Sequence, residues 1–279
     1  MPKPVKVSVV IPAYNEAACL PECLDALARQ TVRPFEVIVV DNDSSDASAD
    51  VAASYPFVKV LTEPKRGRVF ARNAGFRAAK GDVLARLDAD AIAPANWVEW
   101  IAQYYANGNE SVALTGGAHF YNMRPAGFIS WAYNWLVFSF NKLLIGYPTL
   151  WGSNMALPRS LWKQVSEDVC QDNTVHEDLD LAVHIHREGG NIYYDHASKV
   201  LVEMRRIHTD RQALWPYLQM WPRTLRLHGY RSWVLCWLVG AGGLYLLSPV
   251  PLVFEKIKPL SNSSVGLTKN SKYQIPNSK

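Results

Sequence analysis

The sequence has few cysteines, a small net charge and no N-terminal stretch that resembles a signal peptide. The net charge is only +4, which does not indicate nucleic acid as a partner. Residues 1–6 lead directly into an apolar β-branched run rather than into a signal-peptide h-region, so we expect no cleavable signal peptide. The cysteines match neither a CxxC redox pair nor a zinc ribbon, so reduced, buried thiols are expected. There are four of them: Cys19, Cys23, Cys170 and Cys236.

Apolar and aromatic residues are abundant. Hydrophobic residues make up 49% of the 279 positions, which is enough for a core and unlike a disordered protein. The chain also has ten Trp and thirteen Tyr, a density that suggests sugar stacking or a membrane interface, although core packing also accommodates aromatics. The length allows one large α/β domain or two smaller ones.

The first ninety residues alternate between apolar β-branched runs and segments with helical spacing. Residues 6–11, 35–40 and 58–61 are typical of strands, and residues 17–30 carry apolar side chains at helical intervals. The polar cluster at 41–46 is typical of a turn that starts a second helix. A βαβαβ beginning of this kind predicts a parallel sheet with right-handed crossovers.

The run from 83 to 90 is mostly apolar and ends in two carboxylates, Asp88 and Asp90. It predicts a buried strand whose carboxyl end faces a ligand crevice. In a regular strand the two aspartates share one side of the sheet, and at its end their oxygens can converge on one hard divalent cation. The alternative is a solvated pair that caps the next helix.

Polar residues follow three of the predicted strands, at 14–16, 41–43 and 88–90. In a parallel sheet these loops share one edge. Together with nearby cations they suit a ligand that has a base, hydroxyls and phosphates, although each cluster alone can simply cap its own helix. The cations are Lys65, Arg66, Arg68 and Arg72.

Four motifs occur in a set order: Val9–Glu16, Val39–Asp46, Ala71–Gly75 and Leu87–Asp90. In this order and spacing the chain resembles a family 2 glycosyltransferase. The resemblance covers about the first 205 residues. It implies an α/β, GT-A (Rossmann-like) fold with a mostly parallel sheet flanked by helices, followed by a C-terminal amphipathic and membrane-associated helical segment.

The resemblance also implies site residues. Asp41 would bind the edge of the base, and Asp43 and Asp88 would lie near the ribose and base. Asp90 would be the principal ligand of Mg²⁺ or Mn²⁺ at the diphosphate, supported by Asp88. The residues implied to bind the nucleotide sugar are Pro12, Ala13, Tyr14, Glu16, Asp41, Asp43, Arg66, Arg72, Asn73, Asp88 and Ala89.

Two further positions bear on this site. Arg86 departs from the usual all-apolar strand, which we take to mean that the strand has one wet face. His208 follows the last predicted strands, at 191–194 and 199–204, and is a candidate metal or diphosphate contact; a surface histidine is the alternative.

Two later segments resemble the acceptor side of the family's cleft. One implies acceptor binding by Trp151, Gly152, Ser153 and Asn154. The other, Glu177-Asp178, opens a predicted helix where the family pattern places its general base. Inverting transfer needs a carboxylate that removes the acceptor hydroxyl's proton, and no enzyme nucleophile. Asp178 is the first choice and Glu177 the second, with helix capping as the alternative.

The remaining segments suggest a membrane. Residues 125–146 are apolar nearly all round and fit a core helix, an interfacial helix or an acceptor lid. Residues 233–254 carry no charge and reach the roughly 20 positions that span a bilayer, so a spanning or re-entrant helix is expected. We expect a GT-A catalytic domain at 1–205, an interfacial and transmembrane or re-entrant helical region at 206–254 and a disordered tail at 255–279. Arginines before the apolar run favour a catalytic domain on the cytoplasmic side of the cell membrane.

The sequence and its resemblance therefore predict a membrane-associated, metal-dependent, inverting glycosyltransferase. A UDP-sugar is the favoured donor and GDP-mannose an alternative, with a glycan or a polyprenyl-linked lipid as acceptor. One rival class is a nucleotidyltransferase of similar sheet, which usually carries a Gly-rich basic loop where this chain has residues 12–16. The other is a non-catalytic, membrane-bound nucleotide-sugar-binding module, against which the acids at 88, 90, 177 and 178 argue.

Overall fold

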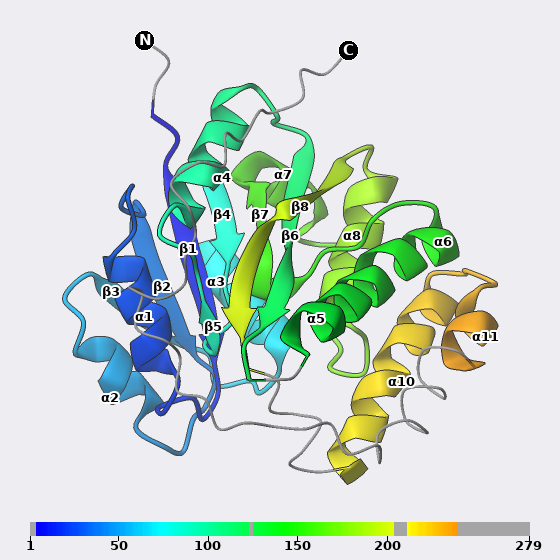
Figure 1. Cartoon of the computed structure of the whole chain (residues 1–279), viewed down its shortest axis with the longest axis horizontal. Helices are drawn as coiled ribbons and strands as arrows, with labels where there is room; N and C mark the ends of the chain where they lie inside the picture. The colour runs from blue at the N-terminus through cyan, green and yellow to red at the C-terminus, as the bar shows by residue number, and fades with distance from the viewer. Residues whose placement is uncertain (1–3, 123–124, 204–210, 239–279) are drawn as a thin grey trace.

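The computed structural model describes residues 4–122, 125–203 and 211–238 (Figure 1). Within these residues, eight strands form one sheet. They are β1 (Val7–Ala13), β2 (Glu36–Asp41), β3 (Val58–Thr62), β4 (Val83–Arg86), β5 (Ala91–Ile92), β6 (Val112–Phe120), β7 (Met155–Pro158) and β8 (Asn191–Val202).

The strand order is β3-β2-β1-β4-β7-β6-β8-β5. The first four strands in this order run parallel to one another, as do β6 and β8. β7 is antiparallel to both of its neighbours, and β5 is antiparallel to β8. The prediction of a mostly parallel, Rossmann-like sheet flanked by helices is confirmed.

Helices cover both faces of the sheet (Figure 1). The helical elements are α1 (Leu20–Ala28), α2 (Ser48–Ala53), α3 (Arg68–Ala78), α4 (Trp97–Ala106), α5 (Ala126–Asn134), the π-helix η1 (Trp135–Phe140), α6 (Asn141–Ile145), the 3₁₀ turn η2 (Gly152–Asn154), α7 (Arg159–Val165), α8 (Glu177–Arg187), α10 (Arg211–Leu227) and α11 (Trp233–Leu235). One face packs against α1, α2 and α4, and the other against α3, α7 and α8.

The central strand β1 shows why these runs are continuously apolar. Val9 and Ile11 pack on the α1 side of the sheet, and Val10 packs on the α3 side. All three side chains are fully buried. Successive residues of a strand point to opposite faces, so a strand covered on both faces is apolar at every position.

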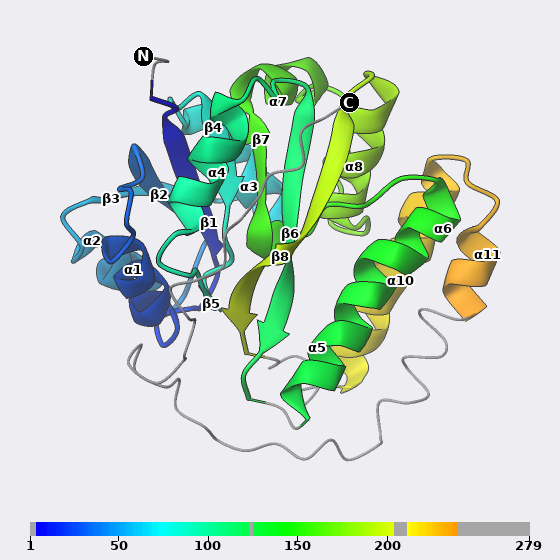
Figure 2. The same ribbon diagram turned by 45° about the horizontal axis from the view of Figure 1, so that its top comes forward.

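The helical segment formed by α5, η1 and α6 lies alongside α10 in both views of the molecule (Figures 1 and 2). Leu144 of α6, Val183 of α8 and Leu225 of α10 belong to one apolar cluster. This cluster attaches the C-terminal helix α10 to the sheet domain through α8, the helix that carries the predicted base.

Three sequence predictions need correction. The strand predicted to reach Asp90 ends at Arg86, because residues 87–90 turn away from the sheet. The two strands predicted at 191–194 and 199–204 are one strand, β8, with an irregularity where Gly116 pairs with Asp195 and Gly117 with Lys199. β7 was not expected as a strand at all.

The C-terminal predictions are only partly covered by the described residues. His208 and the tail at 255–279 lie outside them, as does the apolar run from 239 onward. In the part of the chain that the structure does describe, no helix has both the length and the apolar character needed to cross a bilayer.

Candidate active site

The carboxyl ends of β1, β2 and β4 meet at one edge of the sheet. Ala13 at the end of β1 is in register with Asp41 at the end of β2, and Val10 is in register with Arg86 at the end of β4. Because these strands are parallel and adjacent, the three polar loops that follow them lie side by side, as predicted.

Asp41 offers a buried hydrogen-bond acceptor at this edge. Its side chain is 8% exposed, and its Oδ1 atom has no hydrogen-bond partner among the described residues. The next residue has a bracing role, because the Asn42 amide donates to the backbone carbonyls of Glu63 and Lys65, and its Oδ1 accepts from the N–H of Gly67. A buried acceptor without a partner marks a place for a ligand donor.

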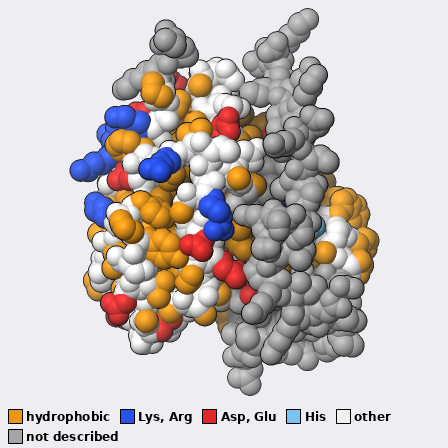
Figure 3. Space-filling model, turned by 60° about the vertical axis from the view of Figure 1, so that its left-hand side comes forward, with side chains coloured by type: hydrophobic (Ala, Val, Ile, Leu, Met, Phe, Trp, Pro, Cys, Tyr) orange, Lys and Arg blue, Asp and Glu red, His pale blue; other side chains and the backbone are white. Residues whose placement is uncertain are grey.

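Exposed side chains lie on the loops that follow β1, β2 and β3. Tyr14 is 45% exposed, and the Arg66 guanidinium lies 5.1 Å from the centre of its ring. Arg66 also donates from Nε to Oδ2 of Asp43 at 2.6 Å. Figure 3 views the molecule from the side of α1, α2 and β3, and on this face Lys/Arg and Asp/Glu side chains are intermingled with hydrophobic ones.

The other residues of the predicted nucleotide loop differ in burial. Pro12 is half-buried and Ala13 is buried, at the end of β1. Glu16 is half-buried, and its backbone N–H donates to the Ser48 hydroxyl at the start of α2. This bond joins the loop after β1 to the segment after β2.

Arg72 and Asn73 on α3 are predicted site residues that contact each other, and Arg72 also contacts the start of α8. Both are almost fully buried. Arg72 donates from NH1 to the backbone carbonyl of Glu177 at 2.7 Å and from Nε to Oδ1 of Asn73 at 3.0 Å. In this structure Arg72 therefore positions the start of α8 from beneath.

A buried arginine joins the predicted metal motif to the predicted base. We call Arg86, Asp88, Glu177 and Asp178 the Arg86 cluster. The guanidinium of Arg86 lies 3.0 Å from Oδ1 of Asp88, 3.4 Å from Oε1 of Glu177 and 2.8 Å from Oδ1 of Asp178. Arg86 is 2% exposed, so the expectation of a wet strand face is wrong. The arginine is buried because three carboxylates pair with it.

The turn η2 contacts this cluster through Gly152 and Ser153. The N–H of Gly152 donates to Oδ2 of Asp178 at 2.8 Å, and the Ser153 hydroxyl donates to Oδ2 of Asp88. A Cβ atom at Gly152 would lie 2.4 Å from Cζ of Arg86, far inside van der Waals contact. Glycine is therefore required at 152 by the close approach of the guanidinium.

The other two predicted acceptor residues are buried. Asn154 has no exposed surface; its Oδ1 accepts from Nε1 of Trp97 at 2.8 Å. Trp151 is 9% exposed and lies edge-on to Tyr133 of α5. Asn154, the last residue of η2, and Trp151, which precedes η2, pack into the interior, and Gly152 and Ser153 are the pair that reaches the carboxylates.

The pKa values of the two acids at the start of α8 are shifted in opposite directions. Burial raises the pKa of Asp178 to about 6; the Glu177 and Asp88 carboxylates add to this and Arg86 opposes it. Burial also disfavours the Glu177 carboxylate, but Arg68 and Arg86 outweigh it and hold its pKa below the usual range. Arg68 Nε lies 3.4 Å from Oε1 of Glu177. Near neutral pH, Asp178 is the carboxylate of this pair that can exchange a proton.

Asp88 and Asp90 provide oxygen ligands of the kind that Mg²⁺ and Mn²⁺ prefer. Both side chains are half-buried, and buried Ala89 separates them. Burial raises the pKa of Cys23, and the charges of Asp90 and then Asp88 add to this shift, so both carboxylates lie near one thiol. This donor set fits a hard divalent cation.

Sequence reasoning missed the part played by two arginines. Arg68 was seen only as a nearby cation, and it pairs with Glu177 across the cleft. Arg86 was read as a solvated residue. The sequence did contain a sign of this role. An arginine within an apolar strand is buried only when an opposite charge is buried beside it, and Asp88 follows two positions later.

This chain is similar to several known proteins. A sequence model described as glycosyl transferase family 2 matches residues 8–165 of the 279. An undecaprenyl-phosphate 4-deoxy-4-formamido-L-arabinose transferase of Pectobacterium carotovorum is 42% identical over 115 residues, which are 38% of this chain and 35% of that protein. Glycosyltransferase AglE of Haloferax volcanii is 39% identical over 100 residues, 33% of each chain. These matches span about a third of the length of the curated relatives.

Solved structures share the fold. Mannosyltransferase PcManGT from Pyrobaculum calidifontis, in complex with GDP-Man and Mn²⁺, superposes with a TM-score of 0.61 at 22% identity over 90% of this chain and 77% of its own. Staphylococcus aureus TarS 1–349 in complex with UDP superposes with a TM-score of 0.54 at 17% identity, over 79% and 65% of the two chains. At these identities the likeness concerns the fold.

Proposed function

We propose, because the chain belongs to glycosyl transferase family 2, that it moves a sugar from a nucleoside-diphosphate donor to a glycan or lipid-linked acceptor with inversion. The observation that carries the proposal is the Arg86 cluster, which joins the acid after β4 to the two acids that open α8. One site thus holds groups suited to the leaving diphosphate and groups suited to the attacking hydroxyl. The family match favours glycosyl transfer over nucleotidyl transfer.

The donor is held by the loops after β1 and β2. The unpartnered Oδ1 of Asp41 accepts an N–H from the edge of the base, and the ring of Tyr14 with Arg66 provides a flat, cationic surface beside it. A UDP-sugar is the favoured donor. The fold neighbours bind GDP-Man and UDP, so GDP-mannose is the second choice.

Asp90, supported by Asp88, is the position for Mg²⁺ or Mn²⁺. When bound, the cation offsets the negative charge that develops on the departing diphosphate. Ser153 and Arg86 fix the two oxygens of Asp88 and orient its carboxylate. A fold neighbour of this chain holds Mn²⁺ with its nucleotide sugar.

Asp178 acts as the general base. Each of its oxygens accepts one hydrogen bond, from Arg86 and from Gly152, and each retains a lone pair for the acceptor hydroxyl. As the hydroxyl oxygen attacks the anomeric carbon, its proton passes to Asp178 and the bond to the diphosphate breaks on the opposite face. Glu177, which Arg68 and Arg86 keep ionised, is the second choice.

We place the acceptor at a membrane surface on the cytoplasmic side. The matching relatives include undecaprenyl-phosphate sugar transferases, which suggests a polyprenyl-phosphate acceptor. The outward face of α5, η1 and α6 supports this placement, since Phe128, Trp131 and Trp135 recur at helical spacing with exposures of 64, 62 and 51%. Aromatic side chains of this kind are favoured at a lipid headgroup interface.

The sugar-transfer activities of the variants Asp178→Asn and Glu177→Gln test which residue is the general base. We expect Asp178→Asn to lose transfer by at least about a hundredfold, the usual contribution of a general base, while it still binds the nucleotide. The control is Asp168→Asn, an exposed aspartate between α7 and α8, which should transfer as the parent does. If Asp178→Asn retains parental activity, Asp178 is not the base; if only Glu177→Gln is inactive, the role belongs to Glu177.

A further inference from the structure

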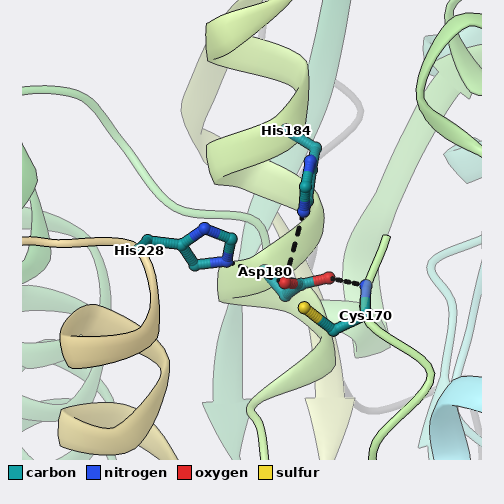
Figure 4. A group of neighbouring side chains, drawn as sticks. All are labelled: Cys170, Asp180, His184 and His228. Atoms are coloured by element: carbon teal, nitrogen blue, oxygen red, sulfur yellow. Dashed lines mark hydrogen bonds and ion pairs between the residues drawn. The ribbon is translucent and has the colours of Figure 1, made fainter. Parts of the chain in front are cut away.

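Four side chains that commonly bind metals converge away from the candidate active site. Cys170 lies between α7 and α8, and His228 directly follows α10. Asp180 and His184 lie one turn apart on α8. We call these four residues the Cys170 cluster. One ligand atom from each residue lies within 4.8 Å of the others, and Figure 4 shows the two imidazoles and the cysteine around the carboxylate of Asp180.

The centre of the cluster is a fully buried carboxylate. Oδ1 of Asp180 lies 2.8 Å from Nε2 of His228 and 3.5 Å from Nε2 of His184. Its Oδ2 accepts the backbone N–H of Cys170 at 2.9 Å. Nε2 of His184 is buried and has no hydrogen-bond partner within the described residues. This nitrogen makes an ion-pair contact with Asp180 but no hydrogen bond, so in the neutral ring protonated on Nδ1 its lone pair is available to a cation.

The thiol of Cys170 must lose its proton before it can bind a cation. Burial and the Asp180 carboxylate raise the pKa of Cys170 to about 12, so the thiol is neutral as the cluster stands. A divalent cation reverses this preference, because its charge offsets both the thiolate and the carboxylate. Binding then releases one proton from Cys170.

We propose that the Cys170 cluster binds one Zn²⁺ ion. A thiolate, two imidazoles and one carboxylate make a four-coordinate set that zinc favours, with closed coordination as in structural sites. Mg²⁺ and Mn²⁺ favour oxygen ligands, so this set discriminates against the cation expected at Asp88 and Asp90. The zinc site is therefore separate from the metal of the transfer reaction, and it does not depend on the proposed function.

A zinc ion in the Cys170 cluster would also affect the candidate active site, because both sites share the first turn of α8. Residues two apart on a helix point about 200° apart, so Asp178 and Asp180 face opposite sides of α8. Asp178 faces Arg86 and Gly152, and Asp180 faces the Cys170 cluster. A zinc ion would fasten the first turn of α8, which carries Glu177 and Asp178, to the end of α10 and to the preceding loop.

Metal analysis of the full chain, purified without a histidine tag and dialysed against metal-free buffer, tests the proposal. We expect about one zinc per chain in the parent and in Cys19→Ser, a control thiol outside the cluster. Cys170→Ser and His228→Gln should lose most of the bound zinc. A parent that holds no zinc after growth in zinc-supplemented medium would show that the cluster is only a hydrogen-bonded network. Equal zinc in all four proteins would place the ion elsewhere, and either result overturns the proposal.

Cobalt spectroscopy keeps the test independent of how well the variants fold. Co²⁺ added to the metal-free parent should give the visible bands of tetrahedral cobalt and a thiolate-to-cobalt charge-transfer band. Modification of the thiols before cobalt is added should abolish the charge-transfer band. Cobalt bound in the parent with an octahedral, all-oxygen spectrum would contradict the assignment.

Discussion

Arg86 is a buried cation whose loss the molecule cannot easily accommodate. Its guanidinium lies within 3.4 Å of three carboxylates, and its side chain is 3% exposed. Removing one partner of a buried ion pair leaves uncompensated charge and costs about 3–5 kcal/mol of stability. We expect Arg86→Met to lower the free energy of unfolding by about this amount, as measured by denaturant titration.

Arg29→Met is the matched control for this variant. Arg29 lies 3.9 Å from Asp25 and both side chains are about half exposed, so its removal should change the free energy of unfolding by less than about 0.5 kcal/mol. Equal effects of the two substitutions would mean that the Arg86 cluster does not contribute to stability as its burial implies.

A substitution at Gly152 tests the close contact between the turn η2 and Arg86. A Cβ at this position meets the guanidinium at 2.4 Å, so Gly152→Ala should displace Arg86 from Asp178 and lower kcat by at least about tenfold. Gly127→Ala on α5 is the control, because nothing lies within 4 Å of its new Cβ. Steady-state kinetics of both variants distinguishes a local contact from a general intolerance of substitution.

The pKa of Asp178 predicts how kcat/KM depends on pH on the acidic side. Its pKa is raised to about 6, and a general base works only when it is ionised. We expect kcat/KM to rise with pH through about 6 and then to level off. A profile that is flat from pH 5 to 8 would indicate that Asp178 is not the base or that proton transfer does not limit the rate.

The sequence was enough to identify the acids of the Arg86 cluster, but not to show that Arg86 is the cation they share. Asp88, Glu177 and Asp178 stand out because they occur after a strand and at a helix start, where a local pattern is enough to find them. The contact between Arg86 and Asp178 joins residues 92 positions apart, and no local pattern encodes it. The contact of Asn154 with Trp97 was hidden for a similar reason, because the two residues are 57 positions apart.

Among the elements, the helical segment of α5, η1 and α6 carries the proposed membrane contact. Trp131 and Trp135 are more than half exposed on its outward face. We expect the double substitution Trp131→Ser and Trp135→Ser to weaken sedimentation with anionic lipid vesicles by at least about tenfold, since each loses apolar area at the headgroup interface.

Phe57→Ser is the control for the vesicle experiment. Phe57 is 40% exposed in the loop before β3, on a different part of the surface. Its substitution should leave vesicle binding unchanged. If the tryptophan variant binds vesicles as tightly as the parent and Phe57→Ser, the outward face of this segment is not the membrane contact.

Element type was predictable in the first ninety residues and less so later. The β-branched runs that became β1 and β2 are buried on both faces, and such runs have a clear composition. The run that became β3 is half-buried to exposed, as its place at one end of the strand order allows, and it was found by its β-branched residues. β7 has only four residues and lies antiparallel between two parallel strands. Its pairing depends on distant partners, which explains why residues 155–158 were not expected as a strand.

At the scale of the whole molecule, the carboxyl end of β4, η2 and the start of α8 come into contact at one edge of the sheet. The loops after β1 and β2 suit a nucleoside, Asp88 and Asp90 suit a cation on its diphosphate, and Asp178 faces the acceptor turn. The family match covers residues 8–165, and the proposed site extends to α8, beyond the matched region.

Product analysis tests the central proposal most directly. The full chain should be incubated with Mn²⁺, undecaprenyl phosphate in vesicles and a panel of UDP- and GDP-sugars, and the lipid and nucleotide products followed by mass spectrometry. We predict a glycosylated lipid of inverted anomeric configuration with at least one donor, stoichiometric nucleotide release, and neither product from Asp178→Asn. Nucleotide release without a glycosylated product from lipid or saccharide acceptors, or no release from any donor, would contradict the proposal.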